Sequence, residues 1–224
     1  VCETATGGEE AAARLLDRRR VALALSKAWK QFKLSSASCF SFVESAGLIY
    51  APKLITDHLG LPRPVPHPED KGLSREAAAA LGPDVDGRTC AGASALTAGI
   101  PPADRPEVAA FILNAMGLTE GFGRLVMLTG HGSSTVNNPH RAGLDCGACA
   151  GQTGEASVRI ACALLNEEAV RSALAERGIA IPQDTWFLPA LHDTTTDEVA
   201  LLDTERVPAG LADEVERLRG FLER

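Results

Sequence analysis

The densest group of chemically reactive side chains lies between residues 130 and 149. This segment opens with the string GHGS (130–133) and closes with LDCGAC (144–149). A loop of this length can bring the imidazole of His131 to the thiolate of Cys146. Zinc is a borderline-soft ion that takes both nitrogen and sulfur ligands. The residue types therefore favour a metal site, with further ligands supplied from elsewhere.

Two other interpretations of the same segment stay open at this stage. Cys146 and Cys149 form a CxxC pair, which is typical of a structural zinc knuckle or a redox dithiol. A knuckle needs two more ligands, and the chain has no second CxxC and no HxxxH. Ser133 could instead act as a nucleophile with a histidine partner, although no GxSxG elbow is present.

The element that must position this segment is the apolar run Arg124–Thr129, which predicts a strand buried on both faces. We expect Gly130 to end that strand at once. In open α/β sheets, ligands bind beyond the carboxyl ends of strands. The glycines on either side of His131 would allow a sharp turn and leave the imidazole reachable.

The remaining patterns alternate between helix and strand. We expect two helices that meet at Asn166, with Asn166 as N-cap and Gly178 as the stop of the second. The other predicted helices cover residues 9–34, 38–59, 74–81, 106–116 and 211–222, and Gly47 and Pro52 could break the second of these. The predicted strands cover residues 179–181, 185–192 and 199–202. This alternation indicates an open α/β fold with a mainly parallel sheet and flanking helices.

Composition limits the partners and the architecture. With 22 basic and 29 acidic residues the net charge is −7, which argues against nucleic acid as a partner. Six cysteines are too few for a disulfide-stapled secreted domain, and core packing is the favoured role of Cys39, Cys90 and Cys162. The longest apolar stretch is too short to span a bilayer. We expect a helical segment over 1–60, a Pro/Gly-rich excursion over 61–105 and an α/β portion over 106–224.

The chain opens without Met and closes inside a predicted amphipathic helix, so we expect a fragment of a larger protein. The first helix is locally basic, which suggests docking to an acidic partner or to anionic lipid, or simply a solvated face. Its basic residues are Arg14, Arg18, Arg19, Arg20, Lys27, Lys30 and Lys33.

Several strings, in order, carry a family resemblance. They are FVE (42–44) with Gly47 and Tyr50, GHGS (130–133), NNPH (137–140), LDCGAC (144–149), LN (165–166) with VR (170–171), GI (178–179) with IPQDT (181–185), and HDTTTD (192–197). Together they resemble the DabA family, the soluble subunits of DabA–DabB inorganic-carbon transporters. The resemblance runs through most of residues 32–203.

The resemblance implies a β-carbonic-anhydrase-like zinc site. His131 and Cys146 match two of the family's ligands, and the other two belong to an upstream Cys-x-Asp-x-Arg segment that this chain lacks. Cys149 matches a family position without being carried over as a ligand. Residues that could support the ligands are Ser133, Asp145, Cys149 and His192. The HDTTTD run around His192 could equally be a simple turn.

The resemblance also implies a function. CO2 would be converted to bicarbonate at the zinc site, on the cytoplasmic face of the cell membrane, with a cation gradient through the membrane subunit DabB preventing free reversal. The chain would then be a peripheral subunit. Two alternatives remain: a zinc-stabilised interaction module without turnover, and a soluble zinc hydrolase.

Overall fold

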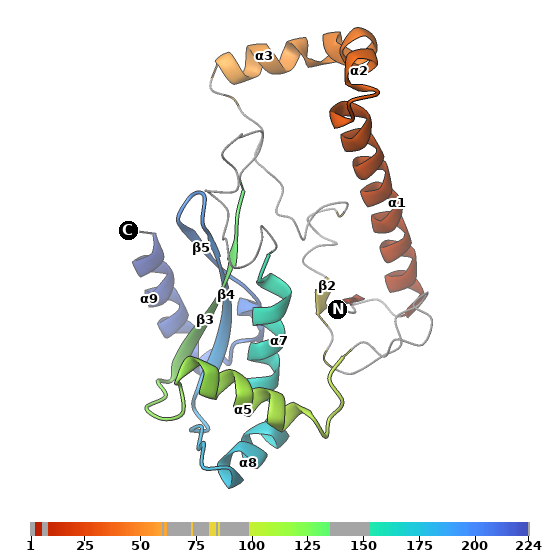
Figure 1. Cartoon of the computed structure of the whole chain (residues 1–224). Helices are drawn as coiled ribbons and strands as arrows, with labels where there is room; N and C mark the ends of the chain where they lie inside the picture. The colour runs from red at the N-terminus through yellow and green to blue at the C-terminus, as the bar shows by residue number, and fades with distance from the viewer. Residues whose placement is uncertain are drawn as a thin grey trace. The chain divides into compact units, whose positions relative to one another are not determined.

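The computed structural model describes residues 3–5, 9–59, 61, 73, 81–83, 85, 99–134 and 153–223. The chain divides into two compact units (Figure 1). The helical unit covers residues 7–79, and the α/β unit covers residues 1–6 and 80–224. None of the described helices combines the length and the apolar character that a bilayer crossing requires.

The helical unit consists of α1 (Glu9–Leu34), α2 (Cys39–Ala46), a 3₁₀ turn (Gly47–Tyr50) and α3 (Ala51–His58). The predicted first helix is confirmed over its full range. The predicted second helix is broken by the 3₁₀ turn that starts at Gly47. Pro52 is the second residue of α3, where its missing N–H removes no intrahelical hydrogen bond.

An aromatic cluster joins α1 to the elements that follow it. The Phe42 ring lies 5.5 Å from both Trp29 and Phe32 and 5.7 Å from Tyr50, measured between ring centroids. The Trp29 indole Nε1 donates a hydrogen bond of 3.3 Å to the Tyr50 hydroxyl. Edge-to-face aromatic pairs add stabilisation beyond the area that they bury. In this cluster Phe42 is buried, whereas Trp29 remains partly exposed.

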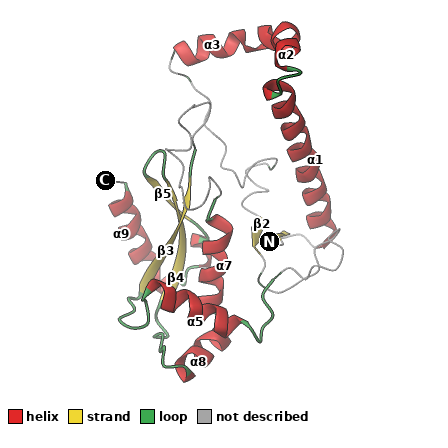
Figure 2. Cartoon of the chain, viewed as in Figure 1, coloured by secondary structure: helices red, strands yellow, loops and turns green. Residues whose placement is uncertain are grey.

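The α/β unit is built on a three-stranded sheet with helices around it (Figure 2). Its elements are β1 (Glu3–Ala5), β2 (Leu81–Pro83), α5 (Arg105–Met116), β3 (Leu125–Gly132), α7 (Glu155–Asn166), α8 (Glu168–Glu176), β4 (Trp186–Asp193), β5 (Glu198–Leu201), 3₁₀ turns at Thr204–Arg206 and Ala209–Leu211, and α9 (Ala212–Leu222). β1 and β2 form a separate antiparallel pair.

The sheet is mixed, with strand order β3-β4-β5. β3 runs parallel to β4, whereas β5 returns antiparallel beside β4 through a tight turn. The α/β class is confirmed. The prediction of a mainly parallel sheet is wrong for the described strands, because the four-residue connection from β4 to β5 is too short for a parallel crossover.

The core of the α/β unit lies between β4 and the helices α5, α7 and α8. Phe187, Leu113 and Leu174 are fully buried there. Every residue from Phe187 to Leu191 is buried, as expected for a strand covered on both faces. Figure 1 shows α7 on one side of the strands and α9 on the other.

Three local predictions are wrong. Gly130 does not end the strand, because β3 continues through Gly132 in register with β4. Residues 179–181 form no strand. Asn166 is the last residue of α7 and not an N-cap: its side-chain amide accepts from the N–H of Phe187 and donates to its carbonyl, at 3.0 and 2.8 Å.

The end of α8 agrees with the sequence. Gly178 has a φ of 87°, and the N–H groups of Gly178 and Ile179 bond to the carbonyls of Ala175 and Leu174. This is a Schellman motif, which requires the left-handed conformation that glycine adopts freely. Residues 74–80 of the predicted helix over 74–81 lie outside the described residues. The last residue of that range, Leu81, is the first residue of β2.

Candidate functional site

The parallel pairing of β3 and β4 brings two histidines together. His131 is the register partner of His192, one residue before both strands end. Their rings meet edge to face with centroids 5.5 Å apart. The carboxyl ends of parallel strands share one edge of the sheet, which is where α/β proteins bind ligands. The predicted location of the site is therefore consistent with the strand geometry.

Two glycines let the start of α7 approach β3 beside His131. A Cβ on Gly130 would lie 2.8 Å from the carbonyl oxygen of Gly154, so neither position readily accepts a larger residue. The N–H of Gly154 donates a 2.7 Å hydrogen bond to the His131 carbonyl. Gly130 faces α7, and side chains alternate along a strand, so the His131 imidazole points away from α7.

The turn that follows β4 is bonded to the end of β3. Thr194 donates to the carbonyl of Gly132 through both its backbone N–H and its hydroxyl, each at 2.9 Å. The N–H of Ser134 donates to the Thr195 hydroxyl at 3.1 Å. These bonds fix the backbone immediately after His131.

Asp193 strengthens the same connection. Its carboxylate accepts a 2.8 Å hydrogen bond from the N–H of Thr195. Burial acts to raise the pKa of this carboxyl, but hydrogen bonds from Thr195, Ser134 and Thr196 outweigh burial and lower the pKa below its usual range. The Asp193 carboxylate is therefore ionised at neutral pH and joins the ends of both strands.

His192 is held by a carboxylate of its own. Its Nε2 lies 2.8 Å from Oδ1 of Asp197, whose backbone has a positive φ of 63°. Asp197 closes the turn by donating its N–H to the Asp193 carbonyl at 2.8 Å. This pair sets the orientation of the His192 ring, which packs edge to face with the His131 ring.

His131 has the properties that a metal ligand needs. Its side chain is exposed at the sheet edge, and none of the residues that the structure describes hydrogen-bonds to its ring nitrogens. A histidine ring nitrogen is a common zinc ligand. Within the described ranges no three His, Cys, Asp or Glu side chains converge as a metal-binding group.

The other predicted site residues have different outcomes. Asp145, Cys146 and Cys149 lie outside the described residues. Ser133 follows β3 directly and is partly buried. In the HDTTTD run, His192 and Asp193 end β4 and residues 194–197 form a turn.

The cysteines outside the segment also differ. Cys162 is 2% exposed, and burial raises the pKa of its thiol to about 12, so core packing is confirmed. Cys39 is exposed, which makes the core prediction wrong for that residue, and Cys90 lies outside the described residues.

Reasoning from the sequence missed the contribution of Ser134 and Thr194 to the site. A signal was present, because a run of Thr and Asp follows one predicted strand and a Ser pair follows the other. Such short polar side chains bond to nearby backbone groups. What the sequence did not reveal is that each run bonds to the other strand.

Comparisons with known proteins identify the family of the chain. The family described as "Probable inorganic carbon transporter subunit DabA" matches residues 1–224. A relative with that same name from Acidithiobacillus ferrooxidans is 50% identical over 223 residues, which is 99% of this chain and 27% of the relative.

Two further relatives are similar over the same length. "Probable inorganic carbon transporter subunit DabA 2" of Bradyrhizobium sp. is 50% identical, and a DabA of Roseiflexus castenholzii is 46% identical; each alignment covers 99% of this chain and 26% of the relative. No solved structure matches the chain.

These matches define a class first: the chain is similar to proteins named as probable inorganic carbon transporter subunits. More particularly, it belongs to the DabA family. The chain spans about a quarter of the length of the curated relatives that it matches.

Proposed function

We propose that this chain is part of an inorganic-carbon transport subunit with a β-carbonic-anhydrase-like zinc site that converts CO2 to bicarbonate vectorially. Membership of the DabA family supports the transport role. The observation that carries the site is the exposed His131 imidazole at the shared carboxyl end of β3 and β4. In this proposal His131 and Cys146 supply two ligands, and the other two come from outside these residues.

The chemistry of the donors fits zinc. A histidine nitrogen and a cysteine thiolate are both preferred zinc ligands, and two further protein ligands complete a tetrahedral site. When bound, zinc supplies a Lewis acid that lowers the pKa of water from about 15.7 to about 7. The chain's own part is to hold His131 at a fixed position and to bring Cys146 to it.

The residues around His131 serve that task. The His131 carbonyl is occupied by the N–H of Gly154, which fixes the peptide on one side of the imidazole. The Gly132 carbonyl on the other side is occupied by Thr194. A ligand whose backbone is fixed on both sides loses little conformational freedom when it binds a metal.

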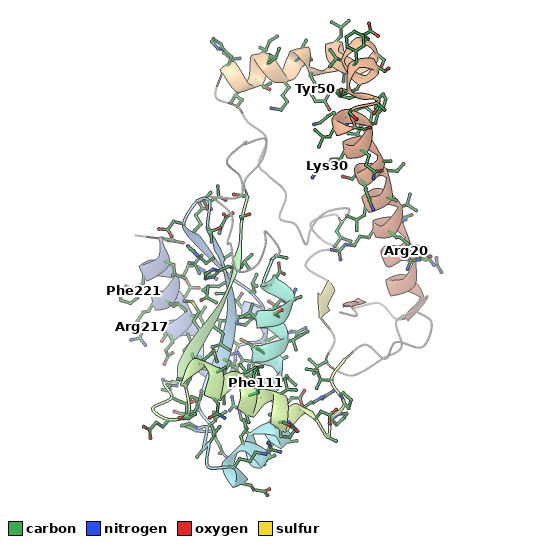
Figure 3. The ribbon with its side chains drawn as sticks, viewed as in Figure 1. Arg20, Lys30, Tyr50, Phe111, Arg217 and Phe221 are labelled. Atoms are coloured by element: carbon green, nitrogen blue, oxygen red, sulfur yellow. The ribbon has the colours of Figure 1, made fainter. Side chains whose placement is uncertain are left out.

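The proposed setting is the cytoplasmic face of the cell membrane, with the membrane subunit DabB as the partner. The helical unit supports this part of the proposal, because it exposes large apolar side chains among basic ones. Trp29 is 46% exposed on α1, and Ile49 and Leu54 are 71% and 73% exposed further along. Arg20 and Lys30 extend from α1 (Figure 3). Such surfaces are typical of protein or membrane contacts.

The decisive experiment measures carbon uptake by cells that make the full-length subunit with or without its membrane partner. We expect uptake only when both are present. His131→Ala and Cys146→Ser should each abolish uptake and zinc content, because a tetrahedral site without one strong ligand binds metal far more weakly. Cys149→Ser serves as the matched control and should have a milder effect.

The alternatives give different results. An interaction module would keep its zinc and its partner but show no uptake that depends on zinc. A soluble hydrolase would act without the membrane subunit. A CxxC knuckle or dithiol would make Cys146 and Cys149 equally indispensable.

A further inference from the structure

We propose that the turn Asp193–Asp197, here called the clamp turn, positions His131 for metal binding, with Thr194 and Asp193 as its positioning residues. This inference rests on the proposed function and assigns that site's support to residues outside the ligand set. It is carried by hydrogen bonds across the two strand ends and by the contact between the two histidine rings.

The first step of the argument concerns the backbone. The carbonyl of Gly132, the residue after His131, accepts two hydrogen bonds from Thr194, one of them from the hydroxyl. The second turn-to-strand contact is the Ser134 N–H, which donates to the Thr195 hydroxyl. The Gly132 carbonyl and the Ser134 N–H lie within three residues of His131 along the chain, so these hydrogen bonds restrain the backbone next to the imidazole.

The second step concerns the carboxylate of Asp193. It bonds within the clamp turn to the Thr195 N–H and across to the Ser134 hydroxyl. Hydrogen bonds to an ionised acceptor are roughly twice as strong as neutral ones. Asp193 therefore keeps the Thr195 hydroxyl in place for Ser134 and holds the end of β3 at the same time.

The third step concerns the ring. The rings of His192 and His131 pack edge to face, and Asp197 fixes His192 through a 2.8 Å contact to Nε2. The Nε2 atom is engaged by Asp197, so this nitrogen serves the turn and not a metal. The clamp turn thus restrains both the backbone and the imidazole of His131.

The same turn offers a matched control. Thr196 is also a threonine of the clamp turn, but its hydroxyl donates to Glu198 at 3.3 Å and not to β3. Thr194→Val and Thr196→Val each replace a threonine hydroxyl with a methyl group and leave the side-chain volume nearly unchanged. Only the first removes a bond to the strand that carries His131.

The experiment measures Zn²⁺ affinity of the full-length subunit by competition with a chromophoric chelator, together with thermal unfolding of the metal-free protein. Removing residues that orient metal ligands typically costs 10–100-fold in metal affinity, and we expect about tenfold weaker binding for Thr194→Val. Asp193→Asn should weaken binding similarly. Thr194→Ser should restore wild-type affinity, and Thr196→Val should match the wild type.

A second readout separates positioning from a general loss of structure. The visible absorption of Co²⁺ bound in place of zinc reports the coordination geometry, and we expect it to change in Thr194→Val but not in Thr196→Val. The unfolding temperature of the metal-free Thr194→Val and Thr196→Val variants should stay close to that of the wild type. Thr195→Val, which removes the Ser134 contact, provides an independent test if Thr194→Val fails to fold.

Two outcomes overturn the inference in distinguishable ways. If the wild type binds zinc and Thr194→Val and Asp193→Asn bind it equally tightly with an unchanged Co²⁺ spectrum, the clamp turn has no positioning role while the proposed function stands. If the wild-type full-length subunit binds no zinc, the proposed function and this inference both fail.

Discussion

The two units of this chain use their apolar residues in opposite ways. In the α/β unit, Leu113, Leu174 and Phe187 are fully buried in one core. Among the described residues of the helical unit, only Phe42 and Ala46 are buried, whereas Phe40 and Leu48 are 72% and 88% exposed. Apolar surface of this extent is normally covered by another surface. The α/β unit therefore buries a core within its own elements, whereas most of the large apolar side chains described in the helical unit are exposed.

Core truncation should produce the largest difference between the units. Phe187→Ala removes a fully buried ring and should lower the free energy of unfolding by about 3–5 kcal/mol. Phe40→Ala removes the same ring from an exposed site and should change it by less than about 0.5 kcal/mol. Urea unfolding of both variants measures this. Similar losses in the two variants would contradict the comparison.

Ion pairs in the two units should also differ in their contribution to the free energy of unfolding, but by less than the core side chains do. Asp203 bonds to Arg159 at 2.6 and 3.0 Å, with both side chains largely buried. Asp203→Ala leaves that guanidinium short of a partner and should cost about 2–3 kcal/mol. Asp17 pairs with Arg20 at 3.4 Å in full exposure, and Asp17→Ala should cost less than about 0.5 kcal/mol. If chemical denaturation shows that both variants lose the same free energy of unfolding, burial does not make the Asp203–Arg159 pair the stronger one.

Charge reversal on α1 tests the role of the helical unit in contact. Changing Arg18, Arg19 and Arg20 to Glu should weaken association with the membrane partner or membrane by about tenfold, and more at low salt, where charges are less screened. Zinc content should stay unchanged. Co-purification across a salt series measures the effect, and salt-independent, undiminished association would exclude an electrostatic contribution of α1.

The smallest predicted effect is a pH dependence confined to the α/β unit. Hydrogen bonds lower the pKa of Asp193 in the folded state, so its contribution to stability is present above the pKa of the unfolded chain. This contribution is lost as pH falls through the lower, folded pKa. Asp193→Asn should therefore narrow the difference in unfolding free energy between neutral and acidic pH. If the free energy of unfolding of this variant depends on pH as in the wild type, the Asp193 carboxylate does not contribute to that pH dependence.

Local patterns predicted most elements, and long-range contacts explain the errors. Gly130 was expected to end β3 because glycine usually interrupts strands. The strand continues because residues 130–132 pair with Leu191–Asp193 and because Gly130 fits against Gly154. Asn166 was expected to cap a helix, but its amide bonds instead to the backbone of Phe187, 21 residues away. Neither partner is visible from neighbouring residues.

The sequence could indicate which described residues lie at the end of β3 and β4. His131 and His192 were each singled out, and the position after an apolar strand was sufficient to place His131 at a sheet edge. The register that sets the two rings side by side depends on how β3 pairs with β4, which neither segment reveals when it is taken alone. The prediction that β3 is buried on both faces is wrong, because Leu125–Leu128 are only half-buried and Thr129 is exposed. The clamp turn follows from that register.

The central claim is that His131 and Cys146 share one zinc ion whose remaining ligands come from outside these residues. The most direct measurement is an anomalous difference map at the zinc edge from crystals of the full-length subunit. The account predicts one peak bonded to the His131 imidazole and to the Cys146 sulfur, with Cys149 not bonded to it. A peak bonded to Cys146 and Cys149 together, or no peak at His131, would contradict it.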